Sequence, residues 1–296
     1  MQQLISRRKT IKIIASTIAI TPLQAVANKN IHSYRWNSTA LGNPVEMQIY
    51  TINKVHLDKI ILLINSEVRR FNKIFYLQDG SSKINLLNNN KVLINPDPEL
   101  INAIHLSEKF YKISKGSFDI TVQPLWNSYS SGAKVNFDGI GFNNIDISKN
   151  KISLLNKNTE ITINALAQGI LTDRIHEILL NSGLNNHLIN FGEGKASGIS
   201  PNDNNWRLLV NNEYLDITNK GFSVSEPEST ILPNKKSHLF NANNYDSASN
   251  IPGKTTVIAK NATLADGLST TYAVSDEKIR KSLIKEFPDV RFIISN

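Results

Sequence analysis

Helical and strand-like patterns follow one another irregularly along this chain. Between positions 55 and 75 apolar residues recur every three or four positions, Ile60, Ile64, Val68 and Phe71 among them, which predicts an amphipathic helix with one buried face. Similar patterns predict helices at residues 97–116, 166–180 and 276–287 and another that begins near 263. Short apolar or alternating runs predict strands at residues 45–52, 151–155, 160–163, 187–190, 207–210, 221–224, 238–240, 255–258 and 290–294. Because strands and helices do not alternate strictly, the order favours a mixed α+β fold.

The composition is that of a folded globular chain. Hydrophobic residues make up 40% and charged residues 20% of the 296 positions, which excludes disordered and collagen-like classes. The formal charge of +8 comes from 33 basic and 25 acidic residues, but four of the basic ones lie in residues 1–27, which hold no acid. The remaining 29 bases against 25 acids leave +4, which is too dispersed for a nucleic-acid-binding surface. The absence of cysteine excludes disulfides, thiolate metal sites and a cysteine nucleophile.

Residues 1–27 have the anatomy of an export signal. Arg7 and Arg8 precede an uncharged apolar stretch at residues 13–20, and Ala25-Val26-Ala27 supplies the small residues of a cleavage site. The apolar stretch is well short of the roughly 20 residues that a spanning helix needs. The arginine pair resembles that of a twin-arginine signal, and an ordinary secretory signal with two chance arginines is the alternative. We therefore expect a mature domain at residues 28–296, a periplasmic location and no transmembrane segment in the mature chain.

Asp266, Ser269 and Thr270 form one candidate site. If the segment from residue 262 is helical, Asp266 and Thr270 are four positions apart and share a face, with Ser269 beside them. A carboxylate and a hydroxyl on one face suit a hard cation such as Mg²⁺. The alternative is a helical N-terminus whose serine and threonine side chains make only local hydrogen bonds.

Two weaker signals lie around Glu193 and at His238. Gly192 and Gly194 follow an apolar strand, where they suit either close approach of the backbone to a ligand or an ordinary tight turn. His238 lies in a short polar strand, as either an acid–base group or a solvated side chain. The sequence has no Walker loop, no G-x-S-x-G elbow and no H-E-x-x-H helix.

Four segments carry motifs in a fixed order along the chain. They are Gly116-Ser117-Phe118-Asp119 with Pro124-Leu125-Trp126, then Asn164-Ala165-Leu166-Ala167-Gln168-Gly169 with Asp173-Arg174, then Phe191-Gly192-Glu193 with Gly198 and Trp206-Arg207, and last Ala265-Asp266-Gly267-Leu268-Ser269-Thr270. Together they resemble the ApbE family, the FAD:protein FMN transferases. The P-L-W, A-Q-G and G-E variants look most like the exported accessory proteins associated with nitrous-oxide respiration.

This resemblance implies a fold and a reaction. The implied fold is a single α+β domain of two lobes with a flavin cleft between them. The implied reaction splits FAD at its pyrophosphate, transfers FMN to a Thr or Ser hydroxyl of a target flavoprotein and releases AMP. A membrane-bound respiratory electron-transfer subunit is one candidate target, and no nucleic acid takes part.

The resemblance also implies roles for individual residues. Mg²⁺ is expected on Asp266, Thr270 and the main-chain carbonyl of Ala165, where it would bridge pyrophosphate oxygens. His238 is expected to take the proton of the acceptor hydroxyl, which suits an imidazole with a pKa of about 6.5. The residues expected to contact FAD are Ser117, Phe118, Asp119, Thr162 and Gln168, and Leu239 is expected to line the isoalloxazine ring.

Two positions depart from the family's pattern in ways that bear on activity. Gln78 stands where a flavin-stacking aromatic residue is expected, which makes Phe75 or Tyr76 the candidate replacement. Asn241 stands where an aspartate usually follows the histidine, which predicts a changed loop and a changed orientation of His238. These departures keep two alternatives open: a periplasmic flavin-binding or FMN-delivery protein without transfer activity, and a metal-dependent FAD pyrophosphatase in which water replaces the protein hydroxyl.

Overall fold

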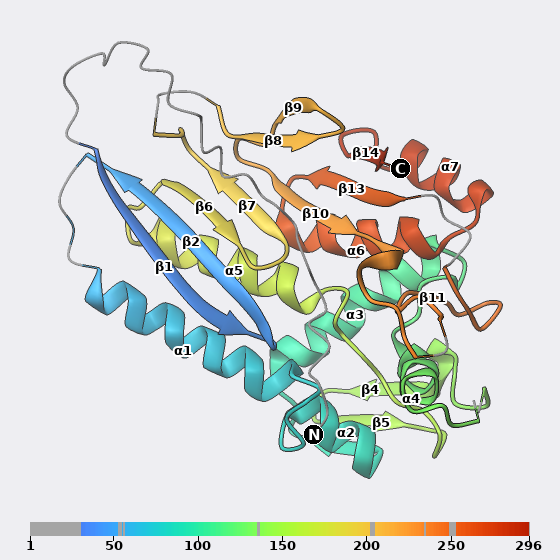
Figure 1. Ribbon diagram of the computed structural model, residues 1–296. Helices are drawn as coiled ribbons and strands as arrows, with labels where there is room; N and C mark the ends of the chain where they lie inside the picture. Colours follow the sequence, from blue (N-terminus) through green and yellow to red (C-terminus); the bar gives the residue numbers. More distant parts are fainter. Residues whose placement is uncertain are drawn as a thin grey trace.

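A seven-stranded antiparallel sheet forms the centre of the protein (Figure 1). The structure is a computed structural model that describes residues 31–52, 55, 57–134, 137–201, 205–233, 235–248 and 253–295, so the predicted export signal lies outside the described residues. In spatial order the strands are β1 (His32–Ala40), β2 (Asn43–Thr51), β6 (Asn186–Asn190), β7 (Gly194–Ser197), β10 (Gly221–Ser225), β13 (Lys254–Ala259) and β14 (Arg291–Ser295). Every neighbouring pair in this sheet runs antiparallel.

Apolar side chains on both faces of this sheet pack into buried clusters. Ile189 and Val257 turn into the main core, together with helices α1 (Asp58–Phe75), α5 (Ala167–Asn181) and α6 (Ala262–Val274). Their neighbours Leu188 and Ile258 turn into a second core cluster, which the hairpin of β8 (Arg207–Val210) and β9 (Glu213–Asp216) closes. The alternation follows from the strand period of two residues. Figure 1 shows the three helices on one side of the sheet and the hairpin on the other.

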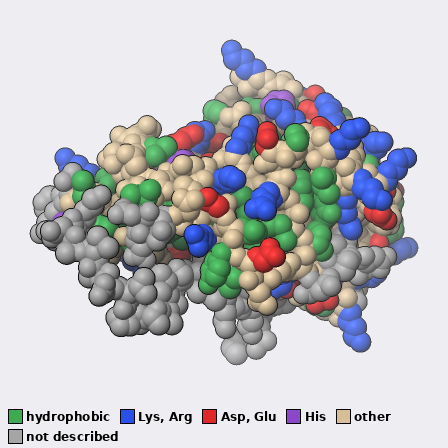
Figure 2. Space-filling view, turned by 90° about the horizontal axis from the view of Figure 1, so that it is seen from above, with side chains coloured by type: hydrophobic (Ala, Val, Ile, Leu, Met, Phe, Trp, Pro, Cys, Tyr) green, Lys and Arg blue, Asp and Glu red, His purple; other side chains and the backbone are tan. Residues whose placement is uncertain are grey.

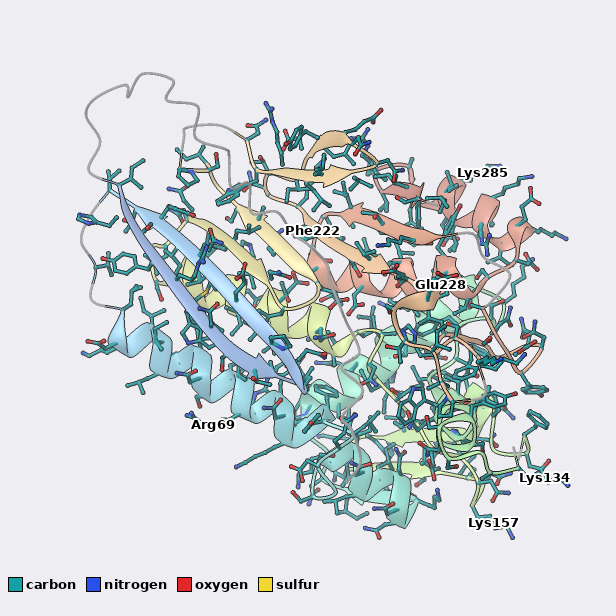
Figure 3. The ribbon with its side chains drawn as sticks, viewed as in Figure 1. Arg69, Lys134, Lys157, Phe222, Glu228 and Lys285 are labelled. Atoms are coloured by element: carbon teal, nitrogen blue, oxygen red, sulfur yellow. The ribbon has the colours of Figure 1, made fainter. Side chains whose placement is uncertain are left out.

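Close packing within the second cluster explains one glycine of the Gly192-Glu193-Gly194 motif. Phe222, labelled in Figure 3, lies on β10 next to β7 and is buried. A Cβ at Gly194 would lie 1.9 Å from its ring, which real atoms do not tolerate. Gly194 is therefore explained by strand packing, and a ligand is not needed to account for it.

Smaller units pack beside the main sheet. A three-stranded sheet has the order β3 (Val92–Ile94), β5 (Lys151–Leu154) and β4 (Ile145–Ser148), next to helices α2 (Lys83–Asn90) and α3 (Pro98–Ile113). Helix α4 (Gln123–Ser131) and the ribbon of β11 (Phe240–Asn241) and β12 (Asp246–Ser247) share a third cluster of Leu125, Leu232 and Phe240. The remaining elements are η1 (Ile120–Val122), η2 (Phe142–Asn144), η3 (Pro227–Ser229) and α7 (Glu277–Glu286). The predicted single α+β domain is confirmed.

Sequence signals account for the helix boundaries. The side chain of Asp97 accepts a 2.8 Å hydrogen bond from the amide of Glu99 and caps α3, and Pro98 occupies its first position. The apolar face predicted for α1 is the buried face of that helix. A buried carboxylate then joins three helices: Glu99 on α3 lies 3.0 Å from Arg70 on α1 and 3.2 Å from Arg174 on α5. The two arginines compensate the burial of this charge.

Two predicted strands are wrong. Residues 160–163 form no strand, because the side-chain amide of Asn88 bonds both the N–H and the C=O of Ile161, at 2.7 and 2.9 Å. The amide of Thr162 donates to the carbonyl of Ile120 at 2.8 Å, so a loop satisfies it in place of a strand. The strand predicted at 238–240 begins only at Phe240, and His238 precedes it.

The charge distribution agrees with the sequence analysis. On the face that Figure 2 shows, basic and acidic side chains are interspersed. Among the helices that the structure describes, none combines the length and the apolar character needed to cross a bilayer.

Candidate active site

The carboxylate of Asp266 lies at the contact between α5 and α6. Asp266 is buried, and its Oδ2 accepts a 3.1 Å hydrogen bond from the amide of Gly169 in the first turn of α5. A Cβ at Gly169 would lie 2.8 Å from the carbonyl oxygen of Ala262 and 2.9 Å from the Cβ of Asp266. The absence of a side chain at position 169 is therefore what lets the two helices approach and brings the amide to the carboxylate.

A second carboxylate makes the reciprocal contact. Asp173, one turn further along α5, accepts 2.9 Å hydrogen bonds from the amides of Ala262 and Thr263 at the start of α6. These amides have no partner within their own helix, and a negative charge near them is favourable. Each helix thus supplies a carboxylate to the other, which fixes the position of Asp266 relative to the start of α5.

The Ala165 carbonyl precedes the first hydrogen bond of α5. Helix α5 starts at Ala167, and its first helical bond joins the amide of Ile170 to the carbonyl of Leu166. The amide of Gly169 is one of the four N-terminal amides that have no acceptor within a helix, and the carboxylate of Asp266 accepts from it. Among the hydrogen bonds of the described residues, none from α5 ends on the Ala165 carbonyl, so its oxygen is available to a cation.

Thr270 is one turn after Asp266 and belongs to a group of hydroxyls. Its Oγ1 lies 3.3 Å from the Oγ of Ser225 on β10. Ser225 in turn lies 2.8 Å from Ser269, which is fully buried. Asp266 and Thr270 share a helical face, as the sequence predicts.

The oxygens proposed for the cation are one carboxylate, one hydroxyl and one main-chain carbonyl. Within the described ranges no three His, Cys, Asp or Glu side chains come together as a metal site, so this set does not resemble a carboxylate cage. It is of the kind that suits Mg²⁺, which takes few protein oxygens and completes its shell with water and phosphate. Mg²⁺ itself stays a prediction.

His238 is held by the main chain. Its amide and its Nδ1 each lie 3.2 Å from the carbonyl oxygen of Thr230. A carbonyl only accepts, so in the neutral ring Nδ1 carries the proton and the lone pair is on Nε2. In this orientation Nε2, the basic nitrogen of the ring, points away from the carbonyl of Thr230.

Asn241 does not orient that ring. Its Nδ2 donates to the carbonyl of Val274 at the end of α6, at 2.8 Å, and its Oδ1 accepts from the amide of Asn243. The changed orientation of His238 expected from the loss of the family's aspartate stays a prediction. Asn241 holds the loop after the histidine against α6, the helix that carries Asp266 and Thr270.

Ser117 lies against this same loop. Its Oγ accepts from Nδ2 of Asn243 at 3.2 Å, and its carbonyl accepts from the amide of Ala242 at 3.1 Å. The predicted residues thus form two sets: Ala165, Asp266 and Thr270 at the junction of α5 and α6, and Ser117 beside the loop that follows His238. Asn241 joins the second set to the end of α6.

Several side chains predicted to contact FAD are engaged inside the protein. The ring of Phe118 is buried and lies 5.7 Å from that of Phe110. The carboxylate of Asp119 caps η1 through the amide and hydroxyl of Thr121, at 2.8 and 2.7 Å. Burial raises its pKa to about 6, against those hydrogen bonds, which lower it. Any contact of these two residues with a flavin would therefore have to come from the main chain.

The remaining predicted residues are placed as follows. Gln168 is buried and donates from Nε2 to the carbonyl of Phe191 at 2.7 Å, which joins α5 to the turn between β6 and β7. Thr162 is half-buried, and its Oγ1 accepts from the amide of Asn164. Leu239 is half-buried against the main core.

Of the two aromatic residues proposed to replace the flavin-stacking one, Phe75 is unsuitable. It is 1% exposed and packs on Phe71 in the core, with ring centres 5.4 Å apart. Tyr76 is half-buried and its ring lies against Gly42. Tyr76 stays the candidate.

The sequence model of the ApbE family matches residues 41–294, which include every one of these site residues. This chain belongs to the ApbE family. The match extends over both the main sheet and the smaller units, in agreement with a single domain.

Similarities to individual proteins support membership in the ApbE family. An FAD:protein FMN transferase of Chlamydia pneumoniae is 26% identical over 142 residues, which are 43% of this chain and 45% of that relative, so the match spans less than half of its length. The flavin transferase ApbE from Vibrio cholerae has the same fold, with a TM-score of 0.78, 14% identity and coverage of 89% of this chain and 93% of that one. The apo form of Pseudomonas stutzeri flavinyl transferase ApbE gives 0.78 at 18% identity, covering 90% and 92%.

Sequence reasoning missed the polar groups beneath the site. Ser223 and Ser225 lie on the helix-facing side of β10, opposite to Phe222, and both are buried. Serines at every second position of an otherwise apolar strand are a signal that could have identified them. Glu193 is fully buried, which the G-E motif alone does not indicate.

Proposed function

We propose that this ApbE protein transfers FMN from FAD to a Thr or Ser hydroxyl of an acceptor flavoprotein and releases AMP. Its family and the name of its Chlamydia relative support transfer of FMN from FAD to a protein. The hydroxyl acceptor, the release of AMP and the use of Mg²⁺ are what the resemblance to the family implies, and they are part of the proposal. An acceptor of this kind would be a respiratory electron-transfer subunit at the membrane.

The observation that carries this proposal is the junction of α5 and α6. The hydrogen bond from Gly169 holds the Asp266 carboxylate, and the Ala165 carbonyl lies just before the first hydrogen bond of α5. Thr270 adds a hydroxyl on the same face of α6. These three oxygens would hold Mg²⁺, which when bound would neutralise charge on the pyrophosphate.

The proposed reaction requires the chain to position FAD and the acceptor and to accept one proton. The acceptor's hydroxyl oxygen bonds to the phosphorus of the FMN half of FAD. The bond from that phosphorus to the bridging oxygen breaks, and AMP leaves with the electron pair. The hydroxyl proton moves to Nε2 of His238, whose tautomer the carbonyl of Thr230 selects. Because phosphoryl transfer needs little covalent help, one base, an oriented donor and neutralisation of the pyrophosphate charge are the contributions required of the site.

Binding of FAD in a cleft between the two lobes is part of the same proposal. The main chain at Ser117 and the loop after His238 are joined by hydrogen bonds, so a ligand lying on one is in reach of the other. Tyr76 is the aromatic side chain proposed for the flavin ring in place of Gln78.

We also propose that the protein works in the periplasm, exported by the signal at residues 1–27. The support is the Arg7-Arg8 pair and the small residues before Asn28. Replacing both arginines by lysine should leave unprocessed protein in the cytoplasm, measured by fractionation. Unchanged export would favour the general secretory route.

One incubation distinguishes this function from its alternatives. The purified protein is mixed with FAD, Mg²⁺ and an acceptor subunit freed of its flavin, and products are separated by mass. Covalent FMN on the acceptor with AMP supports the transferase. Free FMN with AMP identifies a pyrophosphatase, and FAD that stays intact and bound identifies a flavin carrier.

A further inference from the structure

Glu193 is a fully buried carboxylate beside the proposed cation site. It lies in the turn between β6 and β7, where its main-chain carbonyl accepts from the amide of Phe191 at 2.9 Å and from the hydroxyl of Thr172 on α5 at 3.2 Å. Its side-chain Oε1 accepts from the Oγ of Ser223 at 3.3 Å. Glu193 is the acidic residue of the G-E variant in the third family-like motif.

A continuous string of hydroxyls runs from this carboxylate to Thr270. The Oγ of Ser223 lies 3.0 Å from that of Ser269, which lies 2.8 Å from that of Ser225, which lies 3.3 Å from the Oγ1 of Thr270. Ser269 also reaches the main-chain carbonyl of Asp266, at 3.0 Å. Ser223, Ser225 and Ser269 are buried, so protein groups decide where their protons point.

The proton count gives the string a direction. Each hydroxyl has one proton, and a carboxylate only accepts. Once Ser223 donates to Glu193, Ser269 donates either to Ser223 or to the carbonyl of Asp266, since a proton given to Ser225 would leave both of those contacts without one. In both cases Ser269 has no proton for Ser225. Ser225 then donates to Ser269, and Thr270 donates to Ser225. The Thr270 oxygen is left with lone pairs only, which is the state that a cation ligand needs.

The opposite orientation of these hydroxyls would direct a proton of Thr270 toward the cation. If Ser223 donated to Ser269, the string could run from Ser269 to Ser225 and on to Thr270, whose own proton would then point outward at the cation. A carboxylate at position 193 disfavours this state, because a hydrogen bond from Ser223 to a carboxylate is stronger than one to the hydroxyl of Ser269.

We propose that Glu193 is a positioning residue that orients the Ser223–Ser269–Ser225 hydroxyls and so holds Thr270 as an acceptor for the divalent cation. This inference rests on the cation site of the proposed function. Glu193 touches neither the cation nor FAD in this scheme. Partners of metal ligands typically contribute roughly 10- to 100-fold to metal affinity, and we expect an effect of that order.

Binding of Mn²⁺ to the purified protein tests this without any turnover. Mn²⁺ takes oxygen ligands as Mg²⁺ does, and its free and bound forms differ in electron paramagnetic resonance. The variants are Glu193→Gln, which keeps shape and an acceptor but removes the charge, and Ser223→Ala, which breaks the string. Their matched controls are Glu99→Gln, a buried carboxylate between two arginines, and Ser107→Ala, a buried serine that bonds only its own helix.

We expect both site variants to lose about 10- to 100-fold in Mn²⁺ affinity. In the presence of a metal chelator, we expect the melting temperatures of the two site variants to fall no more than those of Glu99→Gln and Ser107→Ala. We expect the double variant, Glu193→Gln with Ser223→Ala, to lose no more Mn²⁺ affinity than either single variant. Wild-type affinity in Glu193→Gln, or a loss in Glu193→Gln with none in Ser223→Ala, would overturn the inference. A wild-type protein that binds no Mn²⁺ would instead overturn the cation site itself, and the inference with it.

Discussion

The main-chain amide of Gly169 on α5 donates to the carboxylate of Asp266 on α6, 97 positions further along the chain, at 3.1 Å. The same amide belongs to the first turn of α5 and has no acceptor within that helix. One hydrogen bond thus satisfies this amide and places a carboxylate, and it can form only because position 169 has no side chain. The proposed cation site depends on this packing of two helices as much as on its ligands.

The first prediction concerns Gly169. Alanine in the interior of a helix ordinarily stabilises by up to about 1 kcal/mol relative to glycine. Here the new Cβ would meet the main chain of α6 at 2.8 Å, so Gly169→Ala should destabilise the fold by about 1–3 kcal/mol and weaken metal binding. Urea unfolding and Mn²⁺ titration measure the two effects. Gly80→Ala, with no atom within 4 Å of the new Cβ, is the control and should change neither the stability nor the Mn²⁺ affinity.

The second prediction concerns the ligands on α6. Asp266→Ala removes the one charged group proposed for the cation and should abolish FAD turnover, because the pyrophosphate charge is left without a bound counter-ion. Thr270→Val should be milder, since water can replace a neutral ligand. Turnover in increasing Mg²⁺ measures both variants. Mg²⁺-dependent turnover at the wild-type rate in Asp266→Ala would reject this helix as the metal site.

The third prediction separates chemistry from binding at His238. His238→Ala should bind FAD with little loss, because the ring is proposed to hold a proton and not the cofactor. Transfer should fall by roughly 10²–10⁴-fold, the usual contribution of a positioned acid–base group. In the wild type the transfer rate should fall at low pH as the imidazole becomes protonated. Single-turnover rates and flavin fluorescence measure the two quantities.

Two outcomes at His238 contradict that role. Normal transfer by His238→Ala would mean that another group takes the proton. Loss of FAD binding in parallel with activity would make the histidine a structural part of the flavin site. His105→Ala, at an exposed position of α3, is the matched control and should change neither quantity.

The fourth prediction concerns Asp119 and pH. Burial raises its pKa to about 6, so between roughly pH 4 and 6 the folded state keeps a proton that the unfolded state loses. The contribution of Asp119 to stability is therefore full below about pH 4, falls as pH rises to 6 and is constant above that. Asp119→Asn lacks this dependence, and its Oδ1 can still accept from Thr121. Relative to the wild type it should gain about 2–3 kcal/mol between pH 4 and 7.

Denaturant unfolding at several pH values measures that difference. Asp146→Asn, at an exposed position, is the control. A constant difference between Asp119→Asn and the wild type at pH 4 and pH 7 would contradict the raised pKa. Unchanged FAD binding in Asp119→Asn would agree with a side chain that supports its own loop and does not contact the flavin.

The sequence predicted what local patterns determine. Three local signals predicted helix positions to within a few residues: the cap at Asp97, the apolar face of α1 and the glycine after α5. The spacing of Asp266 and Thr270 correctly predicted that both side chains share one face of α6. The fold class followed from the order of elements. These features depend on residues a few positions apart, which a single sequence displays directly.

Long-range hydrogen bonds could not be predicted in the same way. The strand expected at 160–163 has the right residues for a strand, but the side chain of Asn88, 73 positions away, satisfies its backbone. The link from Glu193 to Ser223 and Ser269 joins three distant elements, and no local spacing indicates it. The same holds for Asn241, whose partner Val274 lies at the end of α6.

The mass of an acceptor flavoprotein after incubation with this protein, Mg²⁺ and a flavin donor tests the central claim most directly. With FAD as donor we predict a gain of one FMN on a Thr or Ser residue and one AMP released for each acceptor modified. With FMN as donor we predict no gain, because no AMP can leave. An unmodified acceptor while FAD is turned over, or equal labelling from FMN and FAD, would contradict the account.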